Sequence, residues 1–240
     1  MRSAHTKVST LVAGVLLATV AGCAEQSQPG GTSPPAQSTL TVEEAQAALL
    51  REGDLPAGWT TDHENVTDEF GTEGEETTPA ECLSFFLYEA EDEPLHEASV
   101  QLYPPDDDLT FQHSVAVHDA PAVSRLDRMA ALLDDCARFT EPRETGDAIE
   151  FQLSPLAYPE LGDRTLAVDV VVTTDDETGY QRRVYVAVGN TVVAMTAARF
   201  VPASADEPAP ATAQAVLEPT DQQLADLLTA ALDKLAQVGA

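Results

Sequence analysis

Two acidic runs are the residues of this chain best suited to gather oxygen ligands for a cation. They are Asp106-Asp107-Asp108 and Asp175-Asp176-Glu177. A calcium ion takes at least about six oxygen ligands, and its common loop spaces carboxylates at alternate positions before a glycine. Neither run has that spacing, and acidic loops on an anionic chain are usually solvated. We therefore predict no metal site and no cofactor.

Histidine could supply zinc ligands, but the spacing does not favour it. His113 and His118 fall in one predicted strand at positions of opposite parity, so their side chains point to opposite faces. The other histidines, at His5, His63 and His96, stand apart in the sequence. Gly-x-Ser-x-Gly, Ser-x-x-Lys and phosphate-binding glycine motifs are absent as well. We predict no catalytic residue, and we predict that the chain is not an enzyme.

Arg182-Arg183 is the single dibasic pair and could bind an anion. A hairpin that turns at Gly189-Asn190 would place Arg182 near Ala197, which brings Arg199 close to the pair. Salt bridges to the surrounding acidic surface are the favoured alternative.

The N-terminus has the features of a secretory signal. Arg2 and Lys7 precede the apolar run Leu11–Val20, which is too short to span a bilayer. Val20-Ala21-Gly22-Cys23 then resembles the bacterial lipobox, in which the cysteine carries lipid. Residues 1–22 are therefore predicted to be a lipoprotein signal peptide and Cys23 the lipidation site. A secretory signal without lipid, or a chance cysteine, is the alternative.

The segment after the lipobox is rich in Ser, Gln, Gly and Pro. It has too little apolar mass to offset its ordering entropy, so residues 23–40 are predicted to be a lipidated, disordered tether. Residues 41–240 then form the folded domain. The predicted location is outside the cytoplasm, anchored to the cell membrane by lipid at Cys23.

Two cysteines remain, Cys82 and Cys136. In an oxidising compartment such a pair is most often a disulfide bond, which we predict here. A reactive thiol is the alternative.

The charge of the chain excludes one class of partner. It has 41 acidic residues against 12 basic residues, a formal net charge of −29. Such a surface repels nucleic acid and anionic headgroups, so nucleic-acid binding is not expected. The acidity fits either a docking face for a basic partner or adaptation to high salt.

Hydrophobic periodicity predicts an α+β fold: a single domain with a mainly antiparallel sheet packed by helices. We expect the helices to cover one face or one end of the sheet, and Trp59 to pack a turn onto the core. Helices are expected at 42–51, 79–89, 122–138 and from 220 onward. Strands are expected at 98–103, 110–118, 148–153, 165–174, 181–188 and 191–199, with a further short strand at 65–70 and a linker at 202–219.

Several short motifs, in order along the chain, resemble a group of actinobacterial envelope lipoproteins and the extracellular sensor domain of PknH-type Ser/Thr kinases. This chain would be a free-standing relative without a kinase. The resemblance implies an extracytoplasmic sensing module with a cleft between helices and sheet. Those sensor domains commonly have two disulfides, whereas this chain can form one. The motifs are Asp54-Leu55-Pro56-Ala57-Gly58-Trp59, Pro79-Ala80-Glu81-Cys82, Leu132-Leu133-Asp134-Asp135-Cys136, Leu161-Gly162-Asp163 and Val186-Ala187-Val188-Gly189-Asn190.

We therefore predict a lipid-anchored, extracytoplasmic binding or sensor-like module without catalytic activity. Its partner would be a small molecule, a lipid or an envelope protein, held in a largely apolar cleft. The alternative is an envelope lipoprotein that docks a basic protein through its acidic surface.

Overall fold

The computed structural model describes residues 39–62, 82, 85, 93–105, 108–142, 148–202 and 213–239. Residues Gln37–Ala240 form one compact unit, which begins slightly before the predicted boundary at residue 41. The short strand predicted at 65–70 lies outside the described residues. Of the helix predicted at 79–89, only Cys82 and Phe85 are described.

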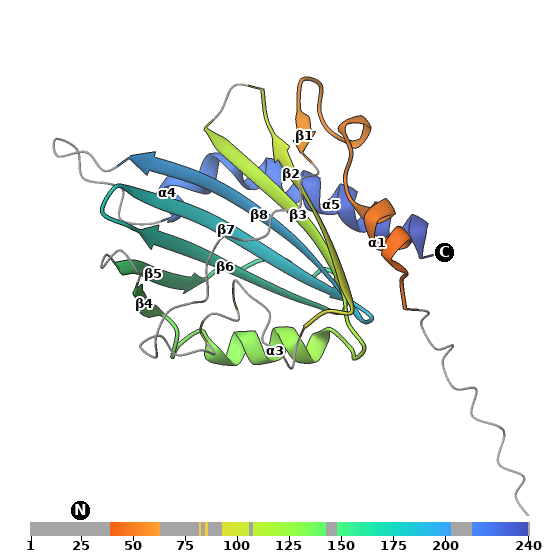
Figure 1. Ribbon diagram of the computed structural model, residues 1–240, viewed down its shortest axis with the longest axis horizontal. Coiled ribbons are helices and arrows are strands. Elements are labelled where there is room, and N and C mark those ends of the chain that lie inside the picture. The colour runs from red at the N-terminus through yellow and green to blue at the C-terminus, as the bar shows by residue number, and fades with distance from the viewer. Residues whose placement is uncertain are drawn as a thin grey trace, which may run out of the picture. The chain divides into compact units, whose positions relative to one another are not determined.

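One sheet of eight strands, with every neighbouring pair antiparallel, organises the molecule (Figure 1). The strand order is β1-β2-β3-β8-β7-β6-β5-β4. The predicted α+β class with a mainly antiparallel sheet is therefore confirmed. The strands are β1 Thr60–Asp62, β2 His96–Tyr103, β3 Leu109–Val117, β4 Arg138–Pro142, β5 Ala148–Pro155, β6 Arg164–Thr173, β7 Glu177–Val188 and β8 Thr191–Pro202.

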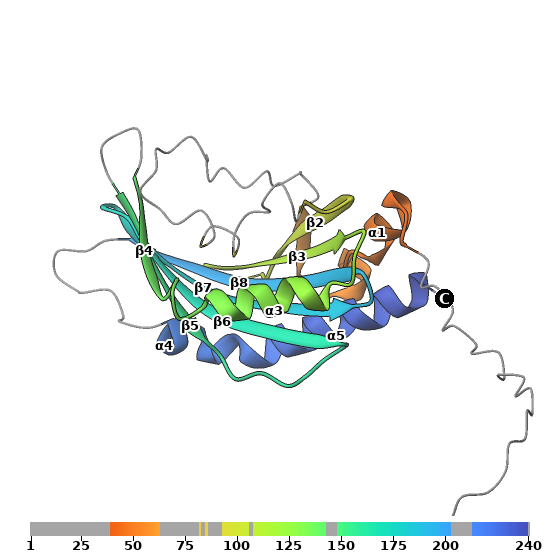
Figure 2. The same ribbon diagram turned by 90° about the horizontal axis from the view of Figure 1, so that it is seen from below.

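The described helices lie against both faces of this sheet. They are α1 Val42–Ala48, α3 Val123–Leu132, α4 Ala213–Leu217 and α5 Asp221–Val238, with single 3-10 turns at η1 Glu52–Asp54 and η2 Glu218–Thr220. Figure 1 shows α5 behind the sheet and α3 in front of it at the lower edge, and Figure 2 gives the same elements from below. The prediction that helices cover one face or one end was wrong.

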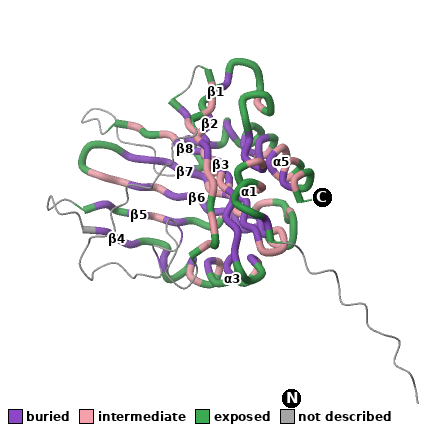
Figure 3. Tube along the Cα trace, turned by 45° about the vertical axis from the view of Figure 1, so that its right-hand side comes forward, coloured by how far each residue is buried: buried purple, intermediate pink, exposed green. Residues whose placement is uncertain are grey.

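Strand alternation explains the two layers. On what we call the α5 face, Val184, Val186, Val193 and Met195 are buried in one core with α1, α4 and α5. On the opposite α3 face, Val168, Val170, Ala187 and Val192 are buried in a second core with α3. Because β6 and β7 are apolar on both faces, each face needs its own cover. Figure 3 shows the buried residues concentrated along the central strands.

The start of the folded region follows the sequence prediction. Thr41 Oγ1 accepts a hydrogen bond from the Glu44 backbone N–H at 3.2 Å, and the Glu44 carboxylate accepts one from the Thr41 N–H at 2.7 Å. This capping box satisfies backbone donors at the first turn of α1. The Trp59 ring packs against Phe111 on β3 at a centroid distance of 5.3 Å, as expected for a residue that fixes a turn on the core.

The prediction of one helix over 122–138 was wrong at its C-terminal end. The α-helix ends at Leu132, residues 133–136 form turns, and the chain continues as β4. Phe139 on β4 stacks on Phe151 of β5 at a centroid distance of 4.7 Å. Pairing with β5 satisfies backbone groups that a longer helix would have bonded internally.

The predicted linker at 202–219 contains structure that sequence reasoning missed. Its last part forms α4 and η2, and Ala213, Val216 and Leu217 are buried in the core of the α5 face. No helix among the described residues is both long and apolar enough to cross a membrane.

Candidate functional site

The acidic runs considered first do not form a cation site in the described part of the chain. Asp106 and Asp107 lie outside the described residues, and Asp108 is exposed. Asp175 and Asp176 are exposed in the turn between β6 and β7. Among the described residues, no group of three or more His, Cys, Asp or Glu side chains could hold a metal ion.

The two histidines lie in different parts of the fold, and only His113 belongs to a strand. His113 is completely buried in the α5 face, whereas His118 lies just beyond the end of β3. His113 Nδ1 accepts a hydrogen bond from the Leu50 backbone N–H at 3.2 Å. Burial, with a smaller contribution from the Lys234 charge, lowers the pKa of His113 from 6.5 to about 3, so the imidazole is neutral.

The three arginines do not gather on one face. The predicted register is confirmed, since Arg182 pairs with Ala197 across the hairpin. Neighbouring residues of a strand point to opposite faces, however, so Arg182 lies on the α5 face and Arg183 on the α3 face. The anion-binding spot that the three arginines could have formed is therefore not assembled, and Arg182 makes the salt bridges that were the favoured alternative.

Arg182 instead makes a buried salt-bridge network. Its side chain is 2% exposed, and it donates to both carboxylate oxygens of Asp169 on β6, at 2.7 and 2.8 Å. It also donates to Asp221 at the first turn of α5. The Asp169 hydrogen bonds raise the pKa of the guanidinium. Arg182 therefore joins two strands and a helix rather than holding an anion.

A band of polar residues crosses the α3 face where α3 does not pack. Gln101, Gln112, Thr196 and Arg183 are direct register partners on β2, β3, β8 and β7. We call these four residues the polar row. Ser99 on β2 and Ser114 on β3 are register partners two residues along the strands from the polar row, and they extend its polar surface. Tyr185 on β7 lies on the same line as these two serines. All seven side chains belong to half-buried residues.

Most of these side chains have unused hydrogen-bonding groups. Within the described part of the chain, Ser99, Gln101, Gln112, Ser114 and Thr196 make no side-chain hydrogen bond. Each amide or hydroxyl can both donate and accept. Half-buried polar groups left without protein partners usually bond to water or to a ligand. The polar row is therefore the candidate binding site.

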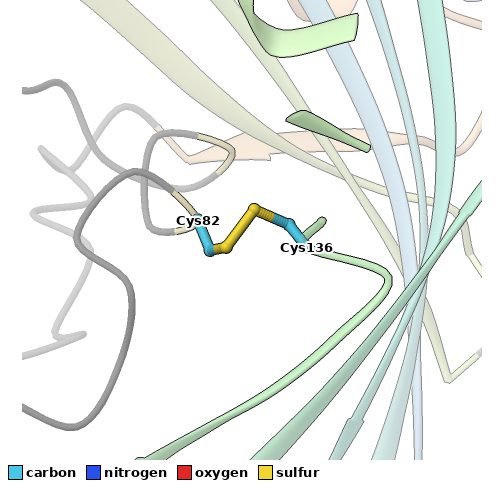
Figure 4. Close-up of a disulfide and its surroundings, with 2 residues drawn as sticks. All are labelled: Cys82 and Cys136. Carbon is cyan, nitrogen blue, oxygen red and sulfur yellow. A yellow bond between two sulfur atoms is a disulfide. The ribbon is translucent and has the colours of Figure 1, made fainter. Parts of the chain in front are cut away.

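The disulfide and the residues near it lie at one side of this site. Cys82 and Cys136 are bonded, with Cα atoms 5.4 Å apart, which ties the chain at residue 82 to the turn after α3 (Figure 4). The nearby Phe85 carbonyl accepts hydrogen bonds from Tyr185 Oη at 2.8 Å and from Arg183 Nη1 at 3.2 Å. Arg183 Nε also donates to Gln181 at 2.9 Å, so the guanidinium is held in place.

A shallow, open pocket of about 340 Å³ lies elsewhere, at the β7–β8 turn. It is lined by Asp119, Pro121, Asp163, Gly189 and Asn190, among others. Asp163 accepts a hydrogen bond from the Gly189 N–H at 2.7 Å, and Asn190 donates to the His118 carbonyl at 2.8 Å. These contacts hold the turn.

Comparison with known proteins gives a fold-level likeness. No family model matches the chain, and no curated protein matches it significantly. Solved structures that resemble it include two mycobacterial proteins. One is an Rv0999 orthologue from Mycobacterium smegmatis, 18% identical, TM-score 0.47, covering 86% of this chain and 99% of that chain. The other is the extracellular domain of PknH from Mycobacterium tuberculosis, 13% identical, TM-score 0.47, covering 84% of this chain and 99% of that chain.

Proposed function

We propose that this protein is a lipid-anchored, extracytoplasmic binding module that holds a polar ligand on the α3 face of its sheet. The polar row carries the proposal, because its amides and hydroxyls lie together, half-buried, with unused hydrogen-bonding groups. Binding sites place a few convergent polar groups to orient a ligand. The lipobox-like Val20-Ala21-Gly22-Cys23 and the disulfide support a location outside the cytoplasm.

The proposed site differs from the apolar cleft expected from the sequence. Its chemistry is that of recognition: no carboxylate, thiol or histidine belongs to the polar row. Amides and hydroxyls do not titrate near neutral pH, so they suit orientation of a ligand better than proton transfer. We therefore propose binding without catalysis.

Mass spectrometry of the full chain, purified from bacterial envelope membranes, tests both parts of the proposal. Under denaturing conditions, we expect a chain that begins at Cys23 and carries acyl chains, and a Cys23→Ala variant should lack them. Under native conditions, we expect a bound molecule that is lost in denaturant.

A matched pair of variants localises the ligand. Gln112→Leu removes an amide from the polar row, whereas Gln223→Leu removes one from the exposed side of α5. We expect Gln112→Leu to lose most of the bound molecule and Gln223→Leu to retain it. A protein without any bound molecule would overturn the proposal and favour docking of a basic protein on the acidic surface.

A further inference from the structure

Three of the four members of the polar row are uncharged and can both donate and accept hydrogen bonds. Gln101 and Gln112 contribute amides and Thr196 a hydroxyl, and each of these groups can both donate and accept. Arg183 is the one charged member, and two of its donors already bond to neutral oxygens of Gln181 and Phe85. A ligand that complements this row needs many groups that both donate and accept, which is the property of hydroxyls.

Charge excludes the common alternatives. The net charge of −29 repels polyanions such as nucleic acid and anionic lipid surfaces. A cationic ligand would favour carboxylates, and the polar row contains none. The chemistry of the row therefore fits an uncharged ligand.

Two exposed aromatic side chains lie at one end of the same face. Tyr103 follows Gln101 by one pleat on β2, and Phe200 follows Thr196 by two pleats on β8. Tyr103 is 37% exposed and Phe200 is 47% exposed. Such rings present apolar surface to a partner, and the C–H faces of sugar rings stack well on them.

Phe200 lies opposite a glycine on the neighbouring strand. Its register partner is Gly179, and a Cβ at that position would lie 2.9 Å from Phe200 Cε1. One edge of the ring therefore lies over the glycine, on the face that carries Gln181 and Arg183. The glycine leaves room for the aromatic side chain there, and about half of Phe200 stays exposed to a partner.

We propose that the ligand of the α3 face is a neutral carbohydrate chain, hydrogen-bonded by the polar row and stacked on Tyr103 and Phe200. The inference rests on the proposed function and names the ligand class for the same site. The four strands of the row span three inter-strand spacings, roughly 14 Å. A surface of that length fits an oligosaccharide better than a single sugar.

An array that carries neutral bacterial oligosaccharides together with sulfated and sialylated glycans tests the proposal. The protein used is the compact unit from Gln37 to Ala240. We expect binding to neutral glycans alone. The tightest neutral glycan, titrated by isothermal calorimetry, should bind at least ten-fold more weakly to Gln112→Leu and to Phe200→Ala, and equally well to Gln223→Leu.

A second substitution guards against misfolding of these variants. Thr196→Val keeps the shape of the side chain and removes its hydroxyl, so it should weaken binding without lowering the melting temperature. Binding to charged glycans alone, or to none, would overturn the proposal. If a peptide or lipid then co-purified with the native protein, the proposed binding function would stand and only the carbohydrate assignment would fail.

Discussion

His113 is a completely buried imidazole whose protonation the fold opposes. Its Nδ1 accepts from the Leu50 N–H, so the single proton of the neutral ring lies on Nε2. Nε2 has no hydrogen-bond partner among the residues that the structure describes. A second proton on Nδ1 would break the bond to Leu50 and place a positive charge in the core between α1 and the sheet.

This geometry predicts a specific loss of stability in acid. The folded-state pKa is about 3 and the unfolded value is near 6.5, so the unfolded chain binds the extra proton first as pH falls. Below pH 6.5, His113 should therefore reduce the free energy of unfolding by about 1.4 kcal/mol per pH unit, until the pH nears 3. Above pH 6.5 it should have no effect.

The test compares urea unfolding of the protein and of His113→Gln across this pH range. The glutamine can still accept from the Leu50 N–H but does not titrate. We expect the wild type to lose more stability than the variant by about 3 kcal/mol over two pH units. Parallel stability curves would contradict the prediction, as would an NMR signature of a charged His113 ring at pH 5.

At this scale the sequence predicts residue chemistry better than residue partners. The alternation of strand residues and the turn at Gly189-Asn190 correctly predict the register that pairs Arg182 with Ala197. The sequence does not show that Arg182 meets Asp221, because that contact depends on where α5 begins against the sheet. The polar row was missed for a related reason: Gln112 reads as an ordinary solvent-facing residue until β3 is placed beside β8.

At the scale of elements, the disulfide joins residue 82 to the turn that follows α3. It fixes Cys82 and the nearby Phe85 against α3 and its following turn, where both are buried in the core of the α3 face. The two cysteines are 54 positions apart in the sequence. Closing a loop of that length restricts the unfolded chain and stabilises the fold by about 4 kcal/mol in the chain-entropy account.

A Cys82→Ala/Cys136→Ala double variant should therefore unfold at lower urea, with a loss in unfolding free energy of about 2–5 kcal/mol. The wild type in reducing agent should unfold like the variant. Loss of the disulfide should also release Phe85 from Arg183 and Tyr185. Hydrogen exchange around these two residues of the α3 face should then become faster. Equal midpoints for the wild type and the variant would contradict the prediction.

Hairpins were the elements most readily predicted. The β7–β8 pair joined by Gly189-Asn190 follows from apolar alternation and turn chemistry, and its register is correct. Helix ends were harder, because the last turns of the helix expected to reach residue 138 compete with strand pairing to β5. The helix α4 was missed because its proline- and alanine-rich surroundings resemble a linker, and burial against β6 and β7 decides its structure.

At the scale of the whole molecule, charge sets the dependence of stability on salt. A net charge of −29 produces self-repulsion in the compact state. Raising sodium chloride from about 0.01 M to about 0.15 M shortens the screening length from roughly 30 Å to roughly 8 Å. We expect the melting temperature to rise over this range by roughly 2–4 °C for each kcal/mol of repulsion relieved.

Differential scanning calorimetry in a sodium chloride series would measure this rise. A plateau above physiological salt would indicate ordinary screening and leave the acidic surface available for a basic partner. A continued rise into molar salt would indicate adaptation to a saline environment. A charge-reduced variant, Asp134→Asn/Asp135→Asn, alters two exposed positions and should show a smaller rise. No change with salt would contradict the expectation.

The strand order carries a consequence for how the molecule reaches its native state. The N-terminal strands β1 to β3 form one meander and β4 to β8 another, and only the β3–β8 pairing joins them across the sheet. β8 is the last strand among the described residues, so the β3–β8 pairing joins residues far apart in sequence and should form late and slowly. If the chain leaves the cytoplasm N-terminus first, its first three strands emerge without their partner. The sheet can then close only after the last strand has crossed the membrane, so completion of folding is tied to completion of export.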